Sequence, residues 1–202
     1  MKKAILFALL VSTAIFAQQK GTFTDTRDGK AYKTVKIGSQ TWMAENLNFK
    51  TKESKCYSDN ESNCTKYGRL YGQDASACPS GWRLPNNSDW ETLVKTAGGK
   101  DVAGKKLKST SGWNKNGNGT DEFGFSALPG GNYFEEEDDD GNSFGGFNLV
   151  GDRSFWWSAT SVMPNGSFYQ YMSHDDGKAG SYTVGAEGLT EFGMYSIRCI
   201  QK

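Results

Sequence analysis

Few side chains in this sequence are suited to covalent chemistry. His174 is the only histidine, and it stands in the segment Ser-His-Asp-Asp-Gly at 173–177, which is typical of a turn. Acyl transfer needs a nucleophile beside a base, and a histidine in a solvated turn is a poor candidate for that base. Paired carboxylates for glycoside hydrolysis stay open, because a sequence gives no distance between two acids. We predict no catalytic residues and a protein that is not an enzyme.

The four cysteines offer either two disulfides or a metal site. An even number of cysteines favours disulfides in an exported chain, and the N-terminal residues of this sequence indicate export. Three pairings are possible. We favour Cys56 with Cys64, which closes a short loop, and Cys78 with Cys199, which ties the middle of the chain to its end. Zinc is the rival interpretation, but no C-x-x-C pair occurs and there is one histidine.

Six consecutive acidic residues at 135–140 offer oxygen ligands for a cation. Such ligands suit calcium, and Asp138 and Asp140 are the candidate metal ligands. The run lacks the spaced Asp-x-Asp-x-Asp-Gly pattern of a calcium loop, and adjacent side chains point in different directions. We expect a solvated acidic loop and no cofactor, with calcium as the possible exception.

Aromatic residues provide the candidate binding surface. Sugar rings stack on exposed aromatic rings, while amides and carboxylates bind the sugar hydroxyls. By alternation Tyr169 and Tyr171 share one face of an expected strand, and Tyr182 follows in a glycine-flanked segment. We predict Tyr169, Tyr171 and Tyr182 as binding residues, although packing within the protein would explain them equally well.

Other large and charged residues are expected to serve the fold. Arg83 and Arg198 should bind buried backbone groups or carboxylates, not a ligand. The tryptophans that lie in the strongest sequence motifs are predicted to be core residues: Trp42, Trp82, Trp90, Trp156 and Trp157.

Composition fits one domain with a core of ordinary size. The chain has 202 residues, of which 36% are hydrophobic. Its 25 glycines, 4 prolines and 13% aromatic residues favour turn-rich folding around large rings over a helical bundle. The 23 basic residues equal the 23 acidic ones, so the basic excess of a nucleic-acid-binding protein is missing.

The first 17 residues have the pattern of a secretory signal peptide. Two lysines precede an apolar run at 4–16, and Ala17 is a small residue where cleavage would fall. The run is too short to span a bilayer comfortably, and no cysteine for lipid attachment lies near it. We predict a mature chain of residues 18–202 that is secreted, periplasmic or at the cell surface, without a membrane span.

Local patterns predict the elements that position these residues. An Asp28-Gly29 turn precedes an expected strand at 31–37, and a second strand follows at 41–44. A capping box from Ser88 to Glu91 and an apolar stripe predict a helix over 88–97. A weaker helix is expected at 101–107, and the remaining short strands at 67–71, 123–128, 155–160, 168–172 and 194–200. The pattern indicates a single α+β domain of mixed short strands, one or two helices and long loops.

Seven ordered segments resemble one family. They lie at 25–38, 41–47 (TWMAENL), 78–85 (CPSGWRLP), 104–108, 119–131, 156–160 (WWSAT) and 197–199 (IRC). Together they resemble the Fibrobacter succinogenes major paralogous domain, from about Phe23 to the C-terminus. The resemblance implies an exported protein without an assigned activity, in a family whose members are often lipid-anchored or repeated in larger chains. This chain departs from it in lacking a lipobox.

A looser resemblance is to the C-type-lectin-like fold, which includes formylglycine-generating enzymes. Trp-Arg-Leu-Pro at 82–85 before a capped helix is similar to the helix entry of those enzymes, and the segment 197–199 is similar to their closing strand. It implies C-type-lectin-like architecture and supports the Cys78–Cys199 pairing. A diverged oxidoreductase of that kind is the least favoured alternative, because four paired cysteines leave no free thiol.

These observations predict a monomeric, exported α+β domain at 18–202, stapled by two disulfides. Its expected function is non-enzymatic binding of polysaccharide or another component of the cell envelope. The main alternative is a structural or adhesion protein of the envelope with a protein partner.

Overall fold

The computed structural model describes residues 18–202, apart from 74–75, 138–139, 141, 163–165 and 185–191. The predicted signal peptide at 1–17 lies outside the described residues. The helices are η1 (Tyr57–Asp59, a 3-10 helix), α1 (Glu61–Tyr67), α2 (Asn87–Thr96) and α3 (Lys100–Leu107). The strands are β1 (Gln19–Thr24), β2 (Ala31–Ile37), β3 (Gln40–Met43), β4 (Leu70–Tyr71), β5 (Trp82–Arg83), β6 (Gly130–Glu137), β7 (Ser143–Val150), β8 (Arg153–Val162), β9 (Gly166–Ser173), β10 (Gly180–Val184), β11 (Phe192–Ser196) and β12 (Ile200–Gln201). Within this part of the chain, no helix is long and apolar enough to cross a membrane.

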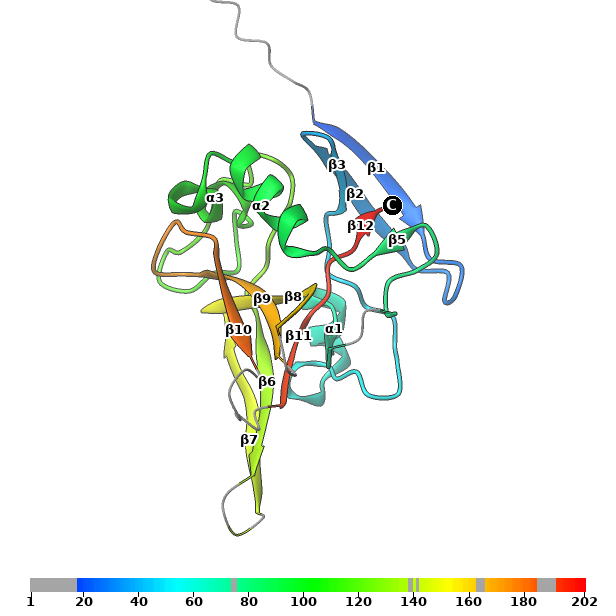
Figure 1. Ribbon diagram of the computed structural model, residues 1–202, viewed down its shortest axis with the longest axis vertical. Coiled ribbons are helices and arrows are strands. Elements are labelled where there is room, and N and C mark those ends of the chain that lie inside the picture. Colours follow the sequence, from blue (N-terminus) through cyan, green and yellow to red (C-terminus); the bar gives the residue numbers. More distant parts are fainter. Residues whose placement is uncertain (1–17, 74–75, 138–139, 141, 163–165, 185–191) are drawn as a thin grey trace, which may run out of the picture.

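Two sheets share the chain, so the predicted α+β class is confirmed. The first has the order β1-β2-β3-β12-β5, and its strands pair antiparallel. The second has the order β10-β9-β8-β11-β6-β7, with β4 added on β11. Figure 1 shows α2 and α3 on the side of β8 and β9, and the β6–β7 hairpin projecting away from the end that carries β1. The last strands link the sheets, because β11 belongs to the second and β12 to the first.

Several predicted elements are confirmed. Strand β2 has the expected bounds, and the Asp28-Gly29 turn lies in the connection between β1 and β2, where Gly29 has a φ of 74°. That positive φ suits glycine, which has no Cβ to clash with the backbone. The two predicted helices are α2 and α3, but α1 was not predicted, and it occupies part of what was expected to be a strand at 67–71.

The predicted strand at 123–128 is wrong. The β pairing described for this segment is a single isolated bridge between Lys108 and Ala127. The backbone turns instead, because Gly124 and Ser126 both have positive φ. The Asp121 carboxylate holds that turn by accepting hydrogen bonds from the N–H and the hydroxyl of Ser126.

The acidic segment also differs from the expectation of a loop. Residues 135–137 belong to β6, which pairs antiparallel with β7. Glutamate is a poor strand former, so local propensity points the wrong way here. The two strands of the hairpin are held together by packing between the rings of Tyr133 in β6 and Phe147 in β7, whose centroids are 5.0 Å apart.

Helix α2 begins one residue before the predicted range, and its N-cap lies two residues before the predicted cap, Ser88. Its N-cap is Asn86, whose side chain accepts from the N–H of Asp89, while the Asp89 carboxylate accepts from the N–H of Asn86. The predicted box from Ser88 to Glu91 is therefore displaced by one built on Asp89. Arg83 explains the choice, since its guanidinium donates two hydrogen bonds to the Asp89 carboxylate. The prediction that Arg83 serves a carboxylate partner is confirmed.

We expect Asp89→Asn to lower the free energy of unfolding by about 1–2 kcal/mol at neutral pH, the usual cost of losing a helix cap. Burial alone would raise the pKa of Asp89, but hydrogen bonds from Arg83 and from the Asn86 N–H bring it below its ordinary value. A depressed folded pKa stabilises the protein above the unfolded pKa of about 3.9, and this contribution disappears as pH falls through the folded pKa. Urea unfolding at pH 7 and pH 3 should therefore show a smaller difference between wild type and variant at pH 3.

Glu91→Gln is the matched control for this variant, because Glu91 is exposed on the same helix and was the predicted capping partner. It should change the free energy of unfolding by less than about 0.5 kcal/mol. A larger cost for Glu91→Gln than for Asp89→Asn would contradict the cap assignment.

The core is built around aromatic rings. Trp42 of β3, Trp90 of α2 and Trp156 of β8 are buried and meet around Phe125, with centroid separations of 4.9–6.4 Å. Trp82 and Trp157 are buried in a second cluster that also contains Cys199. The prediction that these five tryptophans are core residues is confirmed.

Both predicted disulfides are present. Cys56 bonds to Cys64 across the start of α1, and Cys78 bonds to Cys199 over a sequence separation of 121. No cysteine is free. Two disulfides indicate an oxidising compartment, such as the extracellular space. They also leave no thiol for the oxidation chemistry of a formylglycine-generating enzyme.

Candidate functional site

The predicted binding tyrosines lie together on one face of the second sheet. Tyr169 and Tyr171 are two residues apart on β9, and Tyr182 of β10 pairs in register with Tyr169. The ring of Tyr182 lies 6.3 Å from that of Tyr169 and 5.5 Å from that of Tyr171, centroid to centroid. We call these three residues the tyrosine surface. β10 stands at the end of the sheet order, so this surface lies toward one edge of the sheet.

Exposure increases across the sheet toward that edge. Phe155, Trp157 and Tyr195 are buried beside the tyrosine surface, and the ring centroids of Phe155 and Tyr195 lie 5.7 and 4.9 Å from that of Tyr169. Tyr169 and Tyr171 are half-buried, whereas Tyr182 is 61% exposed. The buried rings therefore flank the half-buried ones on the same face of the sheet, and Tyr182 extends the surface into solvent.

The ring of Tyr182 is tilted relative to the other two rings of the tyrosine surface. The ring plane of Tyr182 makes angles of 30° with Tyr169 and 35° with Tyr171. Gly180 contributes to this arrangement, because a Cβ at that position would meet the ring of Tyr171 at 2.2 Å. The missing side chain thus lets Tyr171 lie over β10. The exposed ring of Tyr182 is free to stack on the apolar face of a ligand.

The hydroxyl of Tyr171 remains protonated at neutral pH. Burial raises the pKa of Tyr171, and the nearby Tyr182 and Asp176 raise it further, while Arg153 opposes them. A protonated phenol can both donate and accept a hydrogen bond. Arg153 and Asp175 are exposed and close enough to act on Tyr171 electrostatically, so polar groups border the rings.

The candidate metal ligands are not brought together by what the structure describes. Asp138 lies outside the described residues, and Asp140 is an exposed residue of the turn after β6. Among the described residues, one group with metal-ligand geometry comprises Cys56, Glu61 and Cys64. Its two sulfurs form a disulfide, and Glu61 pairs with Arg69 at 2.7 Å, so these atoms already have partners. Calcium at Asp138 and Asp140 stays a prediction.

His174 lies beside a shallow cavity of about 220 Å³. Its Nδ1 is 3.4 Å from a carboxylate oxygen of Asp152, and the side chain is mostly buried. Buried Lys108 lies at the same cavity and donates to the backbone carbonyls of Ser173 and Asp176. These contacts connect loops to the end of β9. The fold therefore accounts for the positions of His174 and Lys108 without a ligand.

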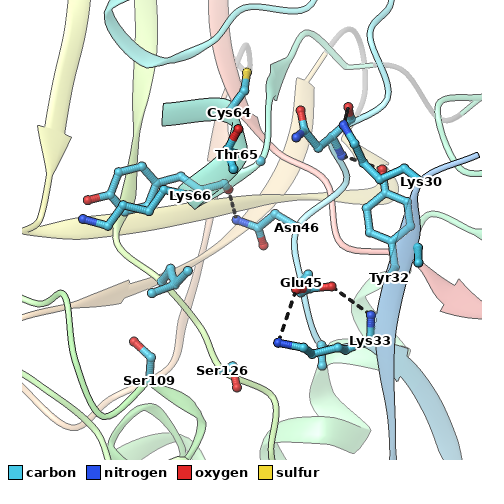
Figure 2. Close-up of a pocket in the computed structure, with 16 residues that line it drawn as sticks. Lys30, Tyr32, Lys33, Glu45, Asn46, Cys64, Thr65, Lys66, Ser109 and Ser126 are labelled. Atoms are coloured by element: carbon cyan, nitrogen blue, oxygen red, sulfur yellow. Dashed lines mark hydrogen bonds and ion pairs between the residues drawn. The ribbon is translucent and has the colours of Figure 1, made fainter. Parts of the chain in front are cut away.

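A pocket that the sequence did not indicate lies between β2, the segment after β3 and the C-terminal end of α1 (Figure 2). Its volume is about 350 Å³. Lys30, Lys33, Lys66 and Glu45 are its charged lining residues, and we call it the lysine pocket. These residues come from three separate segments, so no spacing in the sequence could have brought them together.

Asn46 forms the inner wall of the lysine pocket. Its amide nitrogen donates to the Tyr67 carbonyl and to the Ser196 hydroxyl, and its Oδ1 accepts from Trp156 Nε1 at 2.9 Å. The same oxygen accepts from Nε and a terminal nitrogen of Arg198, at 3.0 and 2.8 Å. Asn46 therefore joins both sheets and α1 behind the pocket.

Arg198 is fully buried and bound to neutral groups. It donates to Asn46 Oδ1 and to the Phe125 carbonyl, and its guanidinium lies 4.2 Å from the centre of the Phe125 ring. Burial lowers the pKa of Arg198 to about 9, so the group is charged at neutral pH. The expectation that Arg198 binds buried backbone rather than ligand is confirmed.

Comparison with known families gives a match over most of the chain. The family described as the Fibrobacter succinogenes major domain matches residues 35–201. Neither the curated proteins nor the solved structures contain a match to this chain. The α+β class therefore rests on the structure itself, and the C-type-lectin-like architecture stays a prediction. The matched range includes the tyrosine surface, all four cysteines and the lining residues of the lysine pocket from Ala44 to Leu128. This match shows that the chain belongs to the Fibrobacter succinogenes major domain family.

Proposed function

We propose that the chain is an exported, non-enzymatic binding module whose tyrosine surface holds a polysaccharide of the cell envelope or its surroundings. One observation carries the proposal: three tyrosine rings lie together on adjacent strands, and the outermost is 61% exposed. A large exposed ring loses part of its contact with water when a ligand stacks on it, which favours binding.

The surroundings of the rings suit hydroxylated ligands. The phenol of Tyr171, together with exposed Arg153 and Asp175, offers hydrogen-bond donors and acceptors at the border of the surface. Sugars combine apolar ring faces with hydroxyls at their edges, so both kinds of contact can form at once. The predicted signal peptide and the disulfides support a location outside the cytoplasm.

We expect Tyr182→Ala to weaken binding about tenfold, since stacking on one ring contributes on the order of 0.5–1.5 kcal/mol beyond the buried area. The measurement is retention of residues 18–202 on insoluble cellulose, xylan, pectin and peptidoglycan, each with calcium and with a chelator. Phe144→Ala is the matched control, because Phe144 is a 52% exposed ring on β7, outside the tyrosine surface. It should retain wild-type binding.

Two results would count against the proposal. Failure of the wild-type protein to bind any of the four polysaccharides would remove its basis. Equal loss of binding in the Tyr182→Ala and Phe144→Ala proteins would show that the tyrosine surface is not the site. Loss of retention in the presence of the chelator would support calcium binding at the acidic residues 135–140.

The second candidate function is adhesion to an envelope protein. Among the described strands, β10 pairs with β9 alone, and its residues Ser181, Tyr182 and Thr183 are exposed. A strand at the end of a sheet can pair with an extended segment of a partner. Capture of one envelope protein by crosslinking on cells, without retention on polysaccharide, would favour this function.

A further inference from the structure

The lysine pocket combines a net positive charge with acceptor hydroxyls. Three lysines and one glutamate line it, and Figure 2 shows Asn46 and Glu45 between Lys66 on one side and Lys30 and Lys33 on the other. Its volume of about 350 Å³ lies at the lower end of the range for ligand pockets, about 300–1,000 Å³. The pocket therefore suits a small anionic group rather than an extended surface.

Each lysine retains donors for a ligand. Lys30 Nζ donates to the Asn48 carbonyl at 3.1 Å, and Lys66 Nζ lies 4.7 Å from the centre of the Tyr67 ring. Lys33 is 78% exposed, and its Nζ is 3.8 Å from a Glu45 oxygen, which is beyond hydrogen-bond distance. An ammonium group has three N–H donors, so none of these contacts uses up its lysine.

The charge behind the wall adds to the positive field. Arg198 lies behind Asn46, and the hydrogen bonds described for its guanidinium go to neutral oxygens of Asn46 and Phe125. No carboxylate of the described residues lies within ion-pair distance of it. Asp121 and Glu45 act on this guanidinium from beyond ion-pair distance, and a low-dielectric interior screens its charge weakly, so Arg198 adds to the positive potential behind the pocket wall.

Three hydroxyls line the same pocket and have already used their protons. Thr65 donates to the Glu61 carbonyl, Ser109 to the Ser111 carbonyl and Ser126 to the Asp121 carboxylate. A hydroxyl that has donated its proton presents lone pairs to incoming donors. The lining thus offers N–H donors for an anion and oxygen acceptors for hydroxyls. Inorganic phosphate at neutral pH carries only one or two O–H donors on one compact group, whereas a carboxylated sugar carries several hydroxyls set apart from its carboxylate and so uses both kinds of group more fully.

We infer that the lysine pocket binds a uronic acid residue of an acidic polysaccharide, with its carboxylate at the lysines and its hydroxyls at Thr65, Ser109 and Ser126. The inference rests on the proposed polysaccharide function and adds the sugar class that this chain selects.

The test uses two probes that differ in charge alone. Titration calorimetry of residues 18–202 with trigalacturonate and with its methyl ester measures the preference for the free carboxylate. We expect the wild-type protein to bind the acid at least tenfold more tightly. The variant K30Q/K33Q/K66Q should lose this preference while still binding the ester. The control K36Q/K50Q/K95Q removes the same charge at exposed lysines outside the pocket and should keep the preference.

The outcomes separate the two proposals. Equal binding of acid and ester by the wild-type protein, or a preference that survives in K30Q/K33Q/K66Q, would overturn the pocket inference alone. Binding of inorganic phosphate that is as tight as that of trigalacturonate and depends on the same lysines would also overturn it, in favour of a simple anion site. Tyr182→Ala should leave intact the part of acid binding that depends on Lys30, Lys33 and Lys66, because Tyr182 does not line the pocket. Failure of both probes, together with failure on all four polysaccharides, would overturn the proposed function as well.

Discussion

Removing the Cys78–Cys199 disulfide is expected to lower the free energy of unfolding by about 5 kcal/mol. The chain-entropy model gives this value for a crosslink that closes a loop of 121 residues. The same model gives about 2.5 kcal/mol for the Cys56–Cys64 disulfide, whose sequence separation is 8. Denaturant unfolding of the two double alanine variants under non-reducing conditions measures both losses.

The position of Cys199 adds a structural reason for the larger effect. Cys199 is fully buried, and its carbonyl accepts from the N–H of Met43 at the end of β3. It lies between β11 and β12, which belong to different sheets. Cutting the crosslink therefore releases the segment that connects the two halves of the core. Alanine is the suitable replacement, because a serine would bury a hydroxyl at this site.

The comparison between the two pairs provides the control. Each variant loses two sulfurs, and Cys56 and Cys64 are also buried, so the pairs differ mainly in the length of the loop that they close. Equal losses for the two disulfides would show that loop closure does not determine their contribution. A loss for Cys78/Cys199 near the full stability of the domain would appear as failure to fold at 37 °C.

The cysteine pairing could be predicted because few alternatives exist for four cysteines. Local elements could be predicted where one strong pattern dominates, as in β2, where side chains alternate. The start of α2 was missed because three neighbouring residues, Asn86, Asn87 and Ser88, can all cap a helix. The choice among them depends on Arg83, whose contact with Asp89 is a tertiary interaction. The hairpin with residues 135–137 was missed for a similar reason, since packing of Tyr133 overrides propensity.

The two candidate sites differ in how far the sequence could predict them. Alternation placed Tyr169 and Tyr171 on one face, and the structure adds the contact with Tyr182 through strand pairing. The lysine pocket required the approach of segments near residues 30, 45 and 66, which depends on the path of the chain between two sheets. Nothing local to Lys66 distinguishes it from any other surface lysine. Sites assembled from distant loops therefore need the fold before they can be recognised.

Asn46→Ala is expected to destabilise the domain by about 4 kcal/mol and to lower the melting temperature by about 10 °C. The substitution removes the side chain that now serves as a hydrogen-bond partner of the Trp156 N–H, the Tyr67 carbonyl and the Arg198 guanidinium. An unsatisfied buried polar group costs about 1–3 kcal/mol, and a buried charge costs more. Thermal unfolding followed by circular dichroism measures the effect. Asn48→Ala is the matched control, because the contacts described for Asn48 use its backbone.

A double-mutant cycle would show whether the unpaired guanidinium dominates this cost. Arg198→Met alone leaves Asn46 Oδ1 with the Trp156 N–H as a donor, so it should cost less than Asn46→Ala. If the buried charge is the main term, the combined variant Asn46→Ala with Arg198→Met should be more stable than Asn46→Ala alone, because replacing both partners of a buried polar pair removes the unpaired charge. Additive losses would instead place the cost in packing around Trp156 and Tyr67. In either case the wall of the lysine pocket is made by a residue that the core requires, so variants that test binding must be built on the lysines and not on Asn46.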